Sequence, residues 1–187
     1  MAMPNSAPIW TVEMVHELPE DGQRYEVIDG ELLVSPSPTL LHQLAAFALV
    51  RRLDAYLRGR GIGLVIFAPL DVTYSPTTNV QPDVLVLPLV NGKVPASVEE
   101  AGRLLLVAEV RSPSTARADR GVKRRLYQRE GIPEYWIVDA DAQSIERWRP
   151  GDARPEIITD RIEWRPEGAS EPLVIELEAF FGSLSKE

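Results

Sequence analysis

Two acidic residues and one lysine stand where together they could act on a phosphodiester bond. Asp83 lies near the start of the apolar run 81–87. Glu109 lies near the end of the apolar run 104–110, and Lys123 follows in a segment of helical character. A carboxylate moved from water into apolar surroundings is strongly destabilised unless a partner compensates its charge. A divalent metal is one such partner, and two carboxylates beside a lysine are the minimal equipment for metal-assisted hydrolysis of a phosphodiester.

The two apolar runs are short and continuous, which is typical of strands buried on both faces of a sheet. If they are antiparallel neighbours, the start of the first meets the end of the second, and Asp83 and Glu109 share one edge of the sheet. Hard oxygen ligands of this kind suit Mg²⁺ or Mn²⁺, which take one or two carboxylates together with waters and phosphate oxygens. Such a metal lowers the pKa of a bound water and stabilises the charge of the transition state.

Asp119, Lys123 and Tyr127 are spaced i, i+4 and i+8, so they share one face of the expected helix. Lys123 could orient the attacking water or stabilise the charge of the transition state, and Asp119 could hold its ammonium group. The alternative is an ordinary solvent-facing ion pair between Asp119 and Lys123, which contributes only a few tenths of a kcal/mol.

Length and composition predict a single globular domain with a real core, since the chain has 187 residues of which 44% are hydrophobic. The absence of cysteine excludes disulfides, thiolate zinc sites and cysteine nucleophiles. The first residues do not resemble a signal peptide, and no apolar stretch approaches the roughly 18 residues of a membrane span. We therefore expect a soluble cytoplasmic protein that does not enter a membrane.

The charge of the chain is unevenly distributed. The whole chain carries −8, the wrong sign for a protein that binds nucleic acid over a broad surface. Residues 111–129 contain seven basic residues and one acid, a local balance of +6. This segment is compatible with a local phosphate-facing site, and a solvated helix face is the alternative.

The order of the elements predicts an α/β (α+β) fold, a mixed sheet with helices packed on it. Asp29-Gly30 between two β-prone stretches predicts a tight hairpin, and a 3.6-residue apolar period ending at Gly59 predicts the longest helix. Helices are expected over residues 11–18, 40–58, about 116–130 and 176–181. Strands are expected over residues 25–28, 31–34, 63–67, 71–74, 82–87, 104–110, 134–139, 144–149, 156–159, 161–164 and 173–175. A turn is expected at residues 75–79 and an irregular connection at 88–103.

Four motifs follow one another along the chain: Pro82-Asp83, then Glu109-Val110-x-Ser112-Pro113-Ser114, then Asp119-x-x-x-Lys123-x-x-x-Tyr127, then residues 131–139. Together they resemble the Uma-two family of "putative restriction endonucleases", in the PD-(D/E)xK nuclease superfamily. Residues 25–32, followed by His42, are similar to the same family. The resemblance covers roughly residues 25–149 and implies a restriction-endonuclease-like fold, a mixed central β-sheet flanked by helices with an N-terminal β-hairpin. We expect one domain over residues 1–187, with 150–187 as a C-terminal extension.

The resemblance also implies roles for individual residues. Asp83 matches the first acid of the superfamily and Glu109 the second, and both would bind the metal. The superfamily places a lysine two residues after the second acid, where this chain has Arg111. Arginine stays protonated above pH 12 and is a poor base for activating water. Lys123, on the helix that follows, resembles a replacement for that lysine at a different position in the sequence.

Glu31 and His42 are secondary candidates, together with Arg111, Asp119 and Tyr127. Glu31 follows the hairpin turn and could face the metal from the opposite side, or it could be an ordinary exposed carboxylate. His42, near the start of the long helix, could contact phosphate or a metal-bound water, or serve as a capping or core residue.

These observations predict an Mg²⁺- or Mn²⁺-dependent endonuclease that hydrolyses phosphodiester bonds, with DNA as the expected substrate. The alternative is a catalytically inactive nuclease-fold module that binds nucleic acid or protein. A serine hydrolase is disfavoured because the sequence has no Gly-x-Ser-x-Gly elbow. A homodimer is expected on geometric grounds, since cutting two strands benefits from two sites related by a twofold axis.

Overall fold

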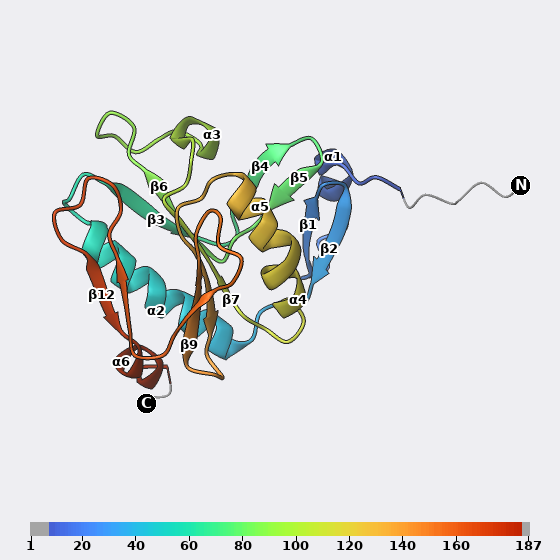
Figure 1. Cartoon of the computed structure of the whole chain (residues 1–187). Helices are drawn as coiled ribbons and strands as arrows, with labels where there is room; N and C mark the ends of the chain where they lie inside the picture. Colours follow the sequence, from blue (N-terminus) through green and yellow to red (C-terminus); the bar gives the residue numbers. More distant parts are fainter. Residues whose placement is uncertain (1–7, 185–187) are drawn as a thin grey trace, which may run out of the picture.

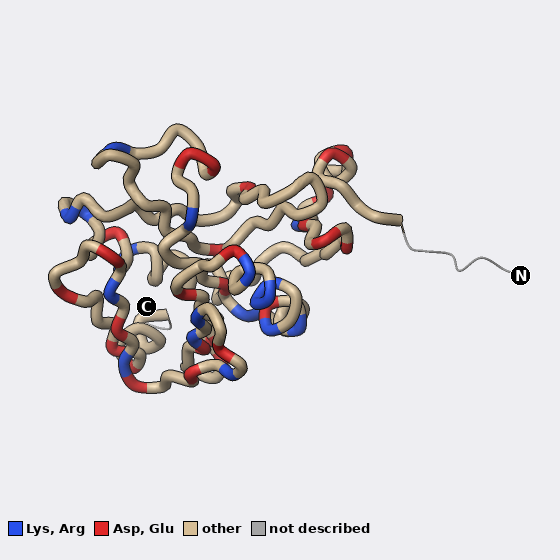
Figure 2. Tube along the Cα trace, turned by 45° about the horizontal axis from the view of Figure 1, so that its top comes forward, with Lys and Arg blue, Asp and Glu red and all other residues tan. Residues whose placement is uncertain are grey.

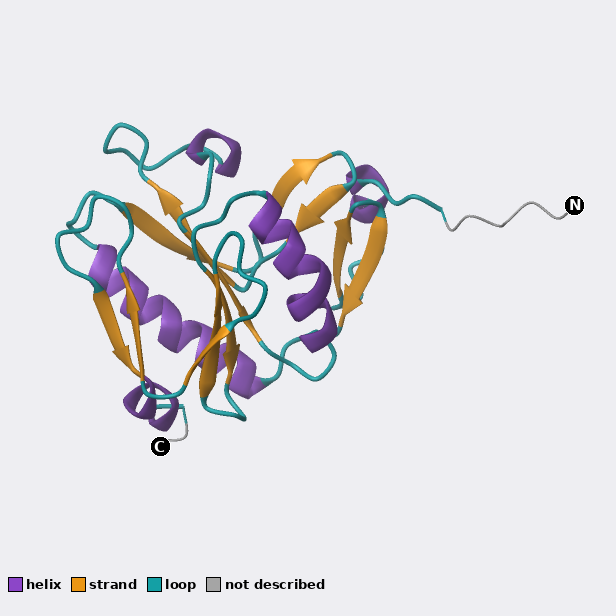
Figure 3. Cartoon of the chain, in the orientation of Figure 1, coloured by secondary structure: helices purple, strands orange, loops and turns teal. Residues whose placement is uncertain are grey.

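The computed structural model describes residues 8–184 and confirms the predicted mixed α+β architecture (Figures 1 and 3). Its helices, in chain order, are α1 Val12–His16, α2 Leu40–Leu57, α3 Val98–Ala101, α4 Ala116–Ala118, the π-helix η1 Asp119–Lys123, α5 Arg124–Arg129 and α6 Leu177–Gly182. No helix in this part of the chain is both long and apolar enough to cross a membrane.

The strands of residues 8–184 form a central sheet, a small sheet and a C-terminal hairpin. The central sheet has the order β10-β9-β8-β7-β6-β3, with β3 Gly63–Phe67, β6 Val84–Pro88, β7 Leu106–Val110, β8 Tyr135–Asp139, β9 Ser144–Trp148 and β10 Glu156–Ile158. The small sheet has the order β2-β1-β5-β4, with β1 Arg24–Ile28, β2 Glu31–Ser35, β4 Val72–Ser75 and β5 Thr78–Val80. The C-terminal hairpin pairs β11 Arg161–Trp164 with β12 Leu173–Glu176.

Strand pairing in the middle of the central sheet confirms the antiparallel arrangement of the two acid-bearing runs. β6 and β7 are antiparallel, with Val84 opposite Ala108. The start of β6 therefore meets the end of β7. β7 and β8 are parallel, and the helical segment α4–η1–α5 forms the crossover between them. The end of β7 thus leads directly into the helix that carries Lys123.

Side chains of β6 and β7 alternate between two cores, because successive residues of a strand point to opposite faces. Val84 and Leu106 face the core beneath α2, which also includes Leu49 and Leu53. On the opposite face, a second core includes Leu85, Leu87, Val107, Leu126 and Tyr127, together with residues of the small sheet. The α4–α5 segment is therefore packed between the central sheet and the small sheet (Figure 1). Both faces of β6 and β7 are covered, which explains their continuous apolar sequence.

The hairpin of β1 and β2 forms as its turn residues predict. Asp29 and Gly30 have φ values of 52° and 81°, the left-handed backbone that a two-residue hairpin turn requires. The register places Ile28 opposite Glu31. The long helix also forms as predicted: Thr39 accepts a hydrogen bond from the His42 N–H as its N-cap.

Three elements differ from the expectation. β5 occupies part of the predicted turn, because pairing with β1 and β4 draws this short segment into the small sheet. α3 forms within the expected irregular connection, where Ser97 caps the helix: Ser97 accepts from the Glu100 N–H, and Glu100 accepts from the N–H of Ala96, just before the cap. The crossover helix has the predicted extent but contains the π-helical turn η1.

The C-terminal hairpin and α6 share the core beneath α2. Trp164, Leu177 and Phe180 are buried there, and Trp164 packs edge-on against Trp136 of the central sheet. The extension beyond residue 150 thus completes the hydrophobic contact of α2 with the sheet.

The close approach of β3 to β6 at Gly63 generates the first prediction. A Cβ at this position would lie 2.4 Å from the Leu87 carbonyl oxygen, a backbone atom that no side-chain rotation can move. Gly63→Ala should therefore lower the free energy of unfolding by about 1–3 kcal/mol, measured by urea denaturation. Gly121→Ala is the matched control: with open space around it, this helical substitution should be neutral or stabilising by up to about 1 kcal/mol. Equal effects of the two substitutions would refute this packing constraint.

Candidate active site

Asp83, Glu109 and Lys123 line one cavity of about 200 Å³ where β6 begins and β7 ends. We call it the acid cavity. Arg24 and His42 also line it, and the loop after β7 closes one side. The structure therefore brings together the two acids and the lysine that were chosen from the sequence.

Asp83 is buried and held by three groups from different elements. Its Oδ1 lies 2.8 Å from Arg24 Nη1, and its Oδ2 lies 3.0 Å from His42 Nε2. The backbone N–H of Val110 also donates to Oδ2, at 2.8 Å. Burial alone would raise the pKa of Asp83, but the hydrogen bond from His42 and the charge of Arg24 outweigh it and hold the pKa well below its usual value. Asp83 is therefore a carboxylate at neutral pH.

Lys123 lies between two buried carboxylates. Its Nζ is 2.9 Å from Glu109 Oε1 and 2.8 Å from Glu26 Oε2. The Tyr127 hydroxyl donates to the same Glu109 oxygen, at 3.0 Å. Glu26 is anchored in turn, because its Oε1 accepts from the Gln81 N–H at 2.8 Å. The ammonium group thus links the small sheet, the central sheet and the crossover helix.

The charges of this cluster shift its pKa values strongly. Burial lowers the pKa of Lys123, but the adjacent Glu109 and Glu26 carboxylates outweigh this and raise it above the ordinary lysine value. Lys123 therefore stays protonated at neutral pH. Burial raises the pKa of Glu109 above its usual range; Lys123 opposes this rise, while Asp83 adds to it.

Asp119 is buried but does not hold the lysine, so the predicted pairing of its carboxylate with the ammonium of Lys123 is wrong. Lys123 pairs with Glu26 and Glu109 instead, because the helix face turns inward against β1 and β7. Among residues 8–184 neither carboxylate oxygen of Asp119 has a hydrogen-bond partner. Burial raises the pKa of Asp119 to about 6, against the attraction of Lys123. The solvent-facing alternative is also wrong, because Asp119 and Lys123 are both buried.

The π-helical turn η1 begins at Asp119 and ends at Lys123. A π-turn closes i→i+5 hydrogen bonds and inserts one residue into the helix, and such turns are frequent at functional sites. The inserted residue changes the phase of the helix between Asp119 and Lys123. Tyr127, one α-helical turn beyond Lys123, then reaches the same carboxylate as the lysine.

The other secondary candidates divide into two groups. His42 and Tyr127 join the cluster through Asp83 and Glu109 respectively. Glu31 does not: it is exposed and lines a separate hollow beside Arg125. Arg111 turns away and its Nη1 donates to Asp139 Oδ2 at 2.8 Å, because β8 lies beside β7. Arg111 therefore occupies the superfamily's lysine position in the sequence, but its charge does not reach the acid cavity.

The sequence interpretation missed Arg24 and Glu26, the two β1 residues that complete the cluster. A signal was present in the period-two pattern of this strand. Val27 faces one core and Ile28 the other, so both faces of β1 are buried. Charged residues on a strand buried on both faces need partners. Those partners lie more than 50 residues away in sequence and can be identified only from the fold.

The carboxylates that line the acid cavity suit a metal that is only partly enclosed by protein. In the described residues, no three acidic or histidine side chains converge to form a complete metal cage. Two carboxylates do face the acid cavity, and Mg²⁺ typically takes one or two carboxylates and completes its shell with water and phosphate. Asp83 and Glu109 are thus the two carboxylates that could hold a hydrated divalent ion, and Arg24, paired with Asp83 Oδ1, would have to leave that oxygen first.

Comparison with solved structures identifies a protein of the same fold. A solved structure with the same fold is that of a "putative nuclease" of DUF820 from Anabaena variabilis, determined at 1.96 Å resolution. The two align with a TM-score of 0.76 and 21% identity, over 94% of this chain and 99% of the other. The two proteins therefore share one fold.

The family model of Uma2, described as "putative restriction endonuclease", matches residues 12–182. The chain belongs to this family, as the motifs around Asp83 and Glu109 predicted. The match extends beyond the expected core into the C-terminal segment. No curated protein matches the chain.

Removing the ammonium of Lys123 should strongly destabilise the fold. Lys123→Met leaves Glu26 and Glu109 buried without a cation, which should lower the free energy of unfolding by about 3–5 kcal/mol at pH 7, measured by urea denaturation. Adding Glu26→Gln to Lys123→Met should recover part of the loss, because one buried charge is removed. Lys93→Met, at an exposed lysine, is the control. A double variant no more stable than Lys123→Met would contradict the unpaired-charge account.

Asp119 should make stability depend on pH. Its pKa rises from an ordinary 3.8 to about 6 on folding, so between these values the folded chain binds a proton more tightly than the unfolded chain. The stability of the wild type should therefore fall, relative to Asp119→Asn, as pH rises from about 4 to about 7. The expected change is about 2–3 kcal/mol, from urea denaturation of both proteins across this range. A difference that stays constant with pH would show that Asp119 does not titrate in this way.

Proposed function

We propose that this protein is an Mg²⁺- or Mn²⁺-dependent endonuclease that hydrolyses phosphodiester bonds of DNA. One observation carries the proposal: Asp83 and Glu109, from adjoining ends of antiparallel strands, face the same cavity as Lys123. Membership of a family described as "putative restriction endonuclease" supports the same class of reaction.

Asp83 and Glu109 would hold the metal, which when bound supplies Lewis-acid stabilisation of the phosphate and a water of lowered pKa. The Val110 N–H and His42 orient the Asp83 carboxylate, so that it needs no rearrangement of its backbone to meet a cation. The Lys123 ammonium and the Tyr127 hydroxyl fix the Glu109 carboxylate through a single oxygen, Oε1. This leaves Oε2 as the oxygen for a ligand.

Lys123 acts in this proposal as a fixed positive charge and hydrogen-bond donor. Its raised pKa excludes a role as the general base at neutral pH. A protonated lysine at the wall of the acid cavity can orient the attacking water and stabilise the charge that develops on the phosphate. Glu26 is its positioning residue, because its carboxylate pairs with the ammonium group at 2.8 Å, alongside Glu109.

A non-catalytic nucleic-acid- or protein-binding module is the second candidate, and the ion pair between Arg24 and Asp83 favours it. The guanidinium lies 2.8 Å from Asp83 Oδ1 and already neutralises that carboxylate. For metal to bind, Arg24 must move toward the substrate phosphate, where it would be a suitable anion partner. A protein in which Arg24 stays in place would keep the fold without the reaction.

Cleavage assays with near-isosteric variants test the catalytic proposal. Asp83→Asn and Glu109→Gln remove one charge each and should lower the rate of Mg²⁺- or Mn²⁺-dependent cleavage of plasmid and single-stranded DNA by about 100-fold or more. Glu146→Gln is the matched control, a buried strand carboxylate of the same sheet paired with Arg120 outside the acid cavity. It should retain wild-type cleavage.

Thermal unfolding with added metal gives a second readout. Millimolar Mg²⁺ or Mn²⁺ should raise the unfolding temperature of the wild type and of Glu146→Gln, but not that of Asp83→Asn, because an ion that binds only the native state stabilises it. Cleavage that all variants share would remove Asp83 and Glu109 from the site. Absence of both cleavage and metal stabilisation in the wild type would refute the nuclease proposal and favour the binding module.

A further inference from the structure

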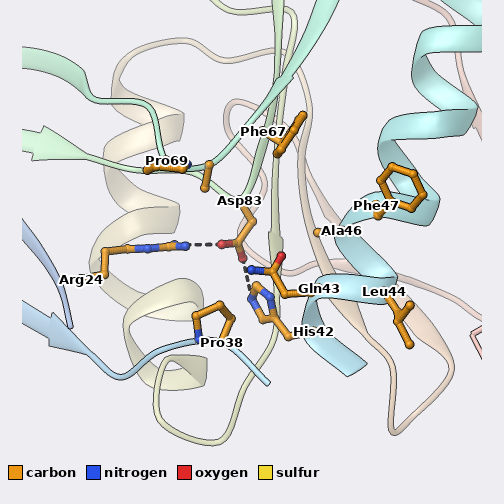
Figure 4. Close-up of a pocket in the computed structure, with 11 residues that line it drawn as sticks. Arg24, Pro38, His42, Gln43, Leu44, Ala46, Phe47, Phe67, Pro69 and Asp83 are labelled. Atoms are coloured by element: carbon orange, nitrogen blue, oxygen red, sulfur yellow. Dashed lines mark hydrogen bonds and ion pairs between the residues drawn. The ribbon is translucent and has the colours of Figure 1, made fainter. Parts of the chain in front are cut away.

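A second cavity, of about 470 Å³, opens beside the acid cavity and shares Asp83, Arg24 and His42 with it. We call it the aromatic cavity. Its walls are mainly apolar, and Phe47 and Phe67 stand on them as exposed rings (Figure 4). Its volume falls within the range of small-molecule sites, which combine apolar walls with a few polar groups. The polar groups here are the ones placed around the proposed reaction centre.

The two phenylalanines are unusually exposed. The exposed fraction is 59% for Phe47 and 60% for Phe67, although aromatic rings are usually among the most buried side chains. Leu40, Leu41 and Leu44 are also exposed on the first turns of the same helix as Phe47. A contiguous group of exposed apolar side chains marks a binding surface more often than scattered ones do.

The fold positions both rings relative to Asp83. Phe67 ends β3, where it pairs with Val84 at the start of β6, and the next residue donates its N–H to the Asp83 carbonyl at 3.0 Å. Phe47 follows Gln43 by one helical turn on α2, and both line the aromatic cavity. The Gln43 amide can both donate and accept hydrogen bonds, which suits the polar edge of a base.

Charge alone does not provide a broad surface for duplex DNA. The chain carries −8, and although basic residues gather along the α4–α5 segment (Figure 2), several are already paired. Arg120 pairs with Glu146, Arg129 with Asp29, and Arg111 with Asp139. Lys123 is buried between two acids. Binding strength must therefore come in part from contacts other than phosphate neutralisation, and stacking of bases on aromatic rings is such a contact.

We propose that the aromatic cavity receives an unpaired base of a DNA strand whose scissile phosphate lies in the acid cavity. Because the two cavities share Asp83, a nucleotide can place its phosphate in one and its base in the other. Bases of a duplex are stacked and paired, so their faces cannot reach Phe47 or Phe67. The substrate is therefore single-stranded or locally unpaired DNA. This inference rests on the proposed function and specifies its substrate class.

Binding of the full-length protein to fluorescently labelled DNA tests the inference independently of cleavage. Dissociation constants would be measured by anisotropy with EDTA, and again with Ca²⁺, for a short single strand, the same strand with an abasic linker, and the blunt duplex. The abasic strand keeps its phosphate charges and lacks one base. The intact single strand should bind at least tenfold more tightly than the duplex. Removing the base at the preferred position should raise the dissociation constant of the single strand about tenfold.

Phe47→Leu and Phe67→Leu keep an apolar side chain but remove the ring. Each should weaken binding of the single strand about tenfold, leave binding of the duplex unchanged, and abolish the difference between intact and abasic strands. Ile157→Ala, at a residue that is 57% exposed on β10, is the control and should bind like the wild type. The unfolding temperature of each variant verifies that it is folded.

The outcomes separate this inference from the proposed function. Unchanged affinities in the leucine variants, or equal affinity for single strand and duplex, would overturn the inference. Light scattering that shows a wild-type dimer disrupted by the leucine variants would also overturn it, since the rings would then bind a second copy of the chain. Ring-dependent binding of the single strand without Mg²⁺- or Mn²⁺-dependent cleavage would support the base site and refute the nuclease proposal alone.

Discussion

The position of the Lys123 ammonium between Glu26 and Glu109 is the interaction on which the site depends. Three elements meet at this buried charge: β1 of the small sheet, β7 of the central sheet and the π-turn of the crossover helix. Two carboxylates and one ammonium leave the cluster with net negative charge. Burial raises the pKa of Glu109 and of Asp119, and the neighbouring carboxylates add to both rises. A hydrated cation near Asp83 and Glu109 would neutralise part of this negative charge, which is the electrostatic reason for proposing a metal site there.

The architecture around this cluster follows from the need to cover both faces of β6 and β7. α2 covers one face and the crossover helix the other, and the C-terminal hairpin and α6 complete the packing beneath α2. At the end of the sheet where β6 starts and β7 ends, the acid cavity and the aromatic cavity lie beside each other. Asp83 lines both cavities there but is itself buried, because packing holds it from behind and Arg24 and His42 hold its carboxylate.

Much of the fold could be predicted because local signals were strong. Asp29-Gly30 specified the hairpin, the apolar period specified α2, and the acids in the apolar runs marked the proposed metal edge. The N-cap Ser97, followed three residues later by Glu100, was an equally local signal for α3 that the interpretation overlooked. The π-turn had no such signal, since the apolar and charged spacing of residues 119–123 predicts a continuous helix without marking an inserted residue.

The sequence by itself determined the order and type of most elements, the family, and the acids at the ends of two buried strands. Those features depend on residues within a few positions of one another or on motifs that can be recognised directly. Only the tertiary structure decided which charges meet: Arg24 with Asp83, Glu26 with Lys123, and Arg111 with Asp139. The reason is physical, since each of these pairs joins different elements, and a buried charge is stabilised by whatever partner the packing brings within hydrogen-bonding distance.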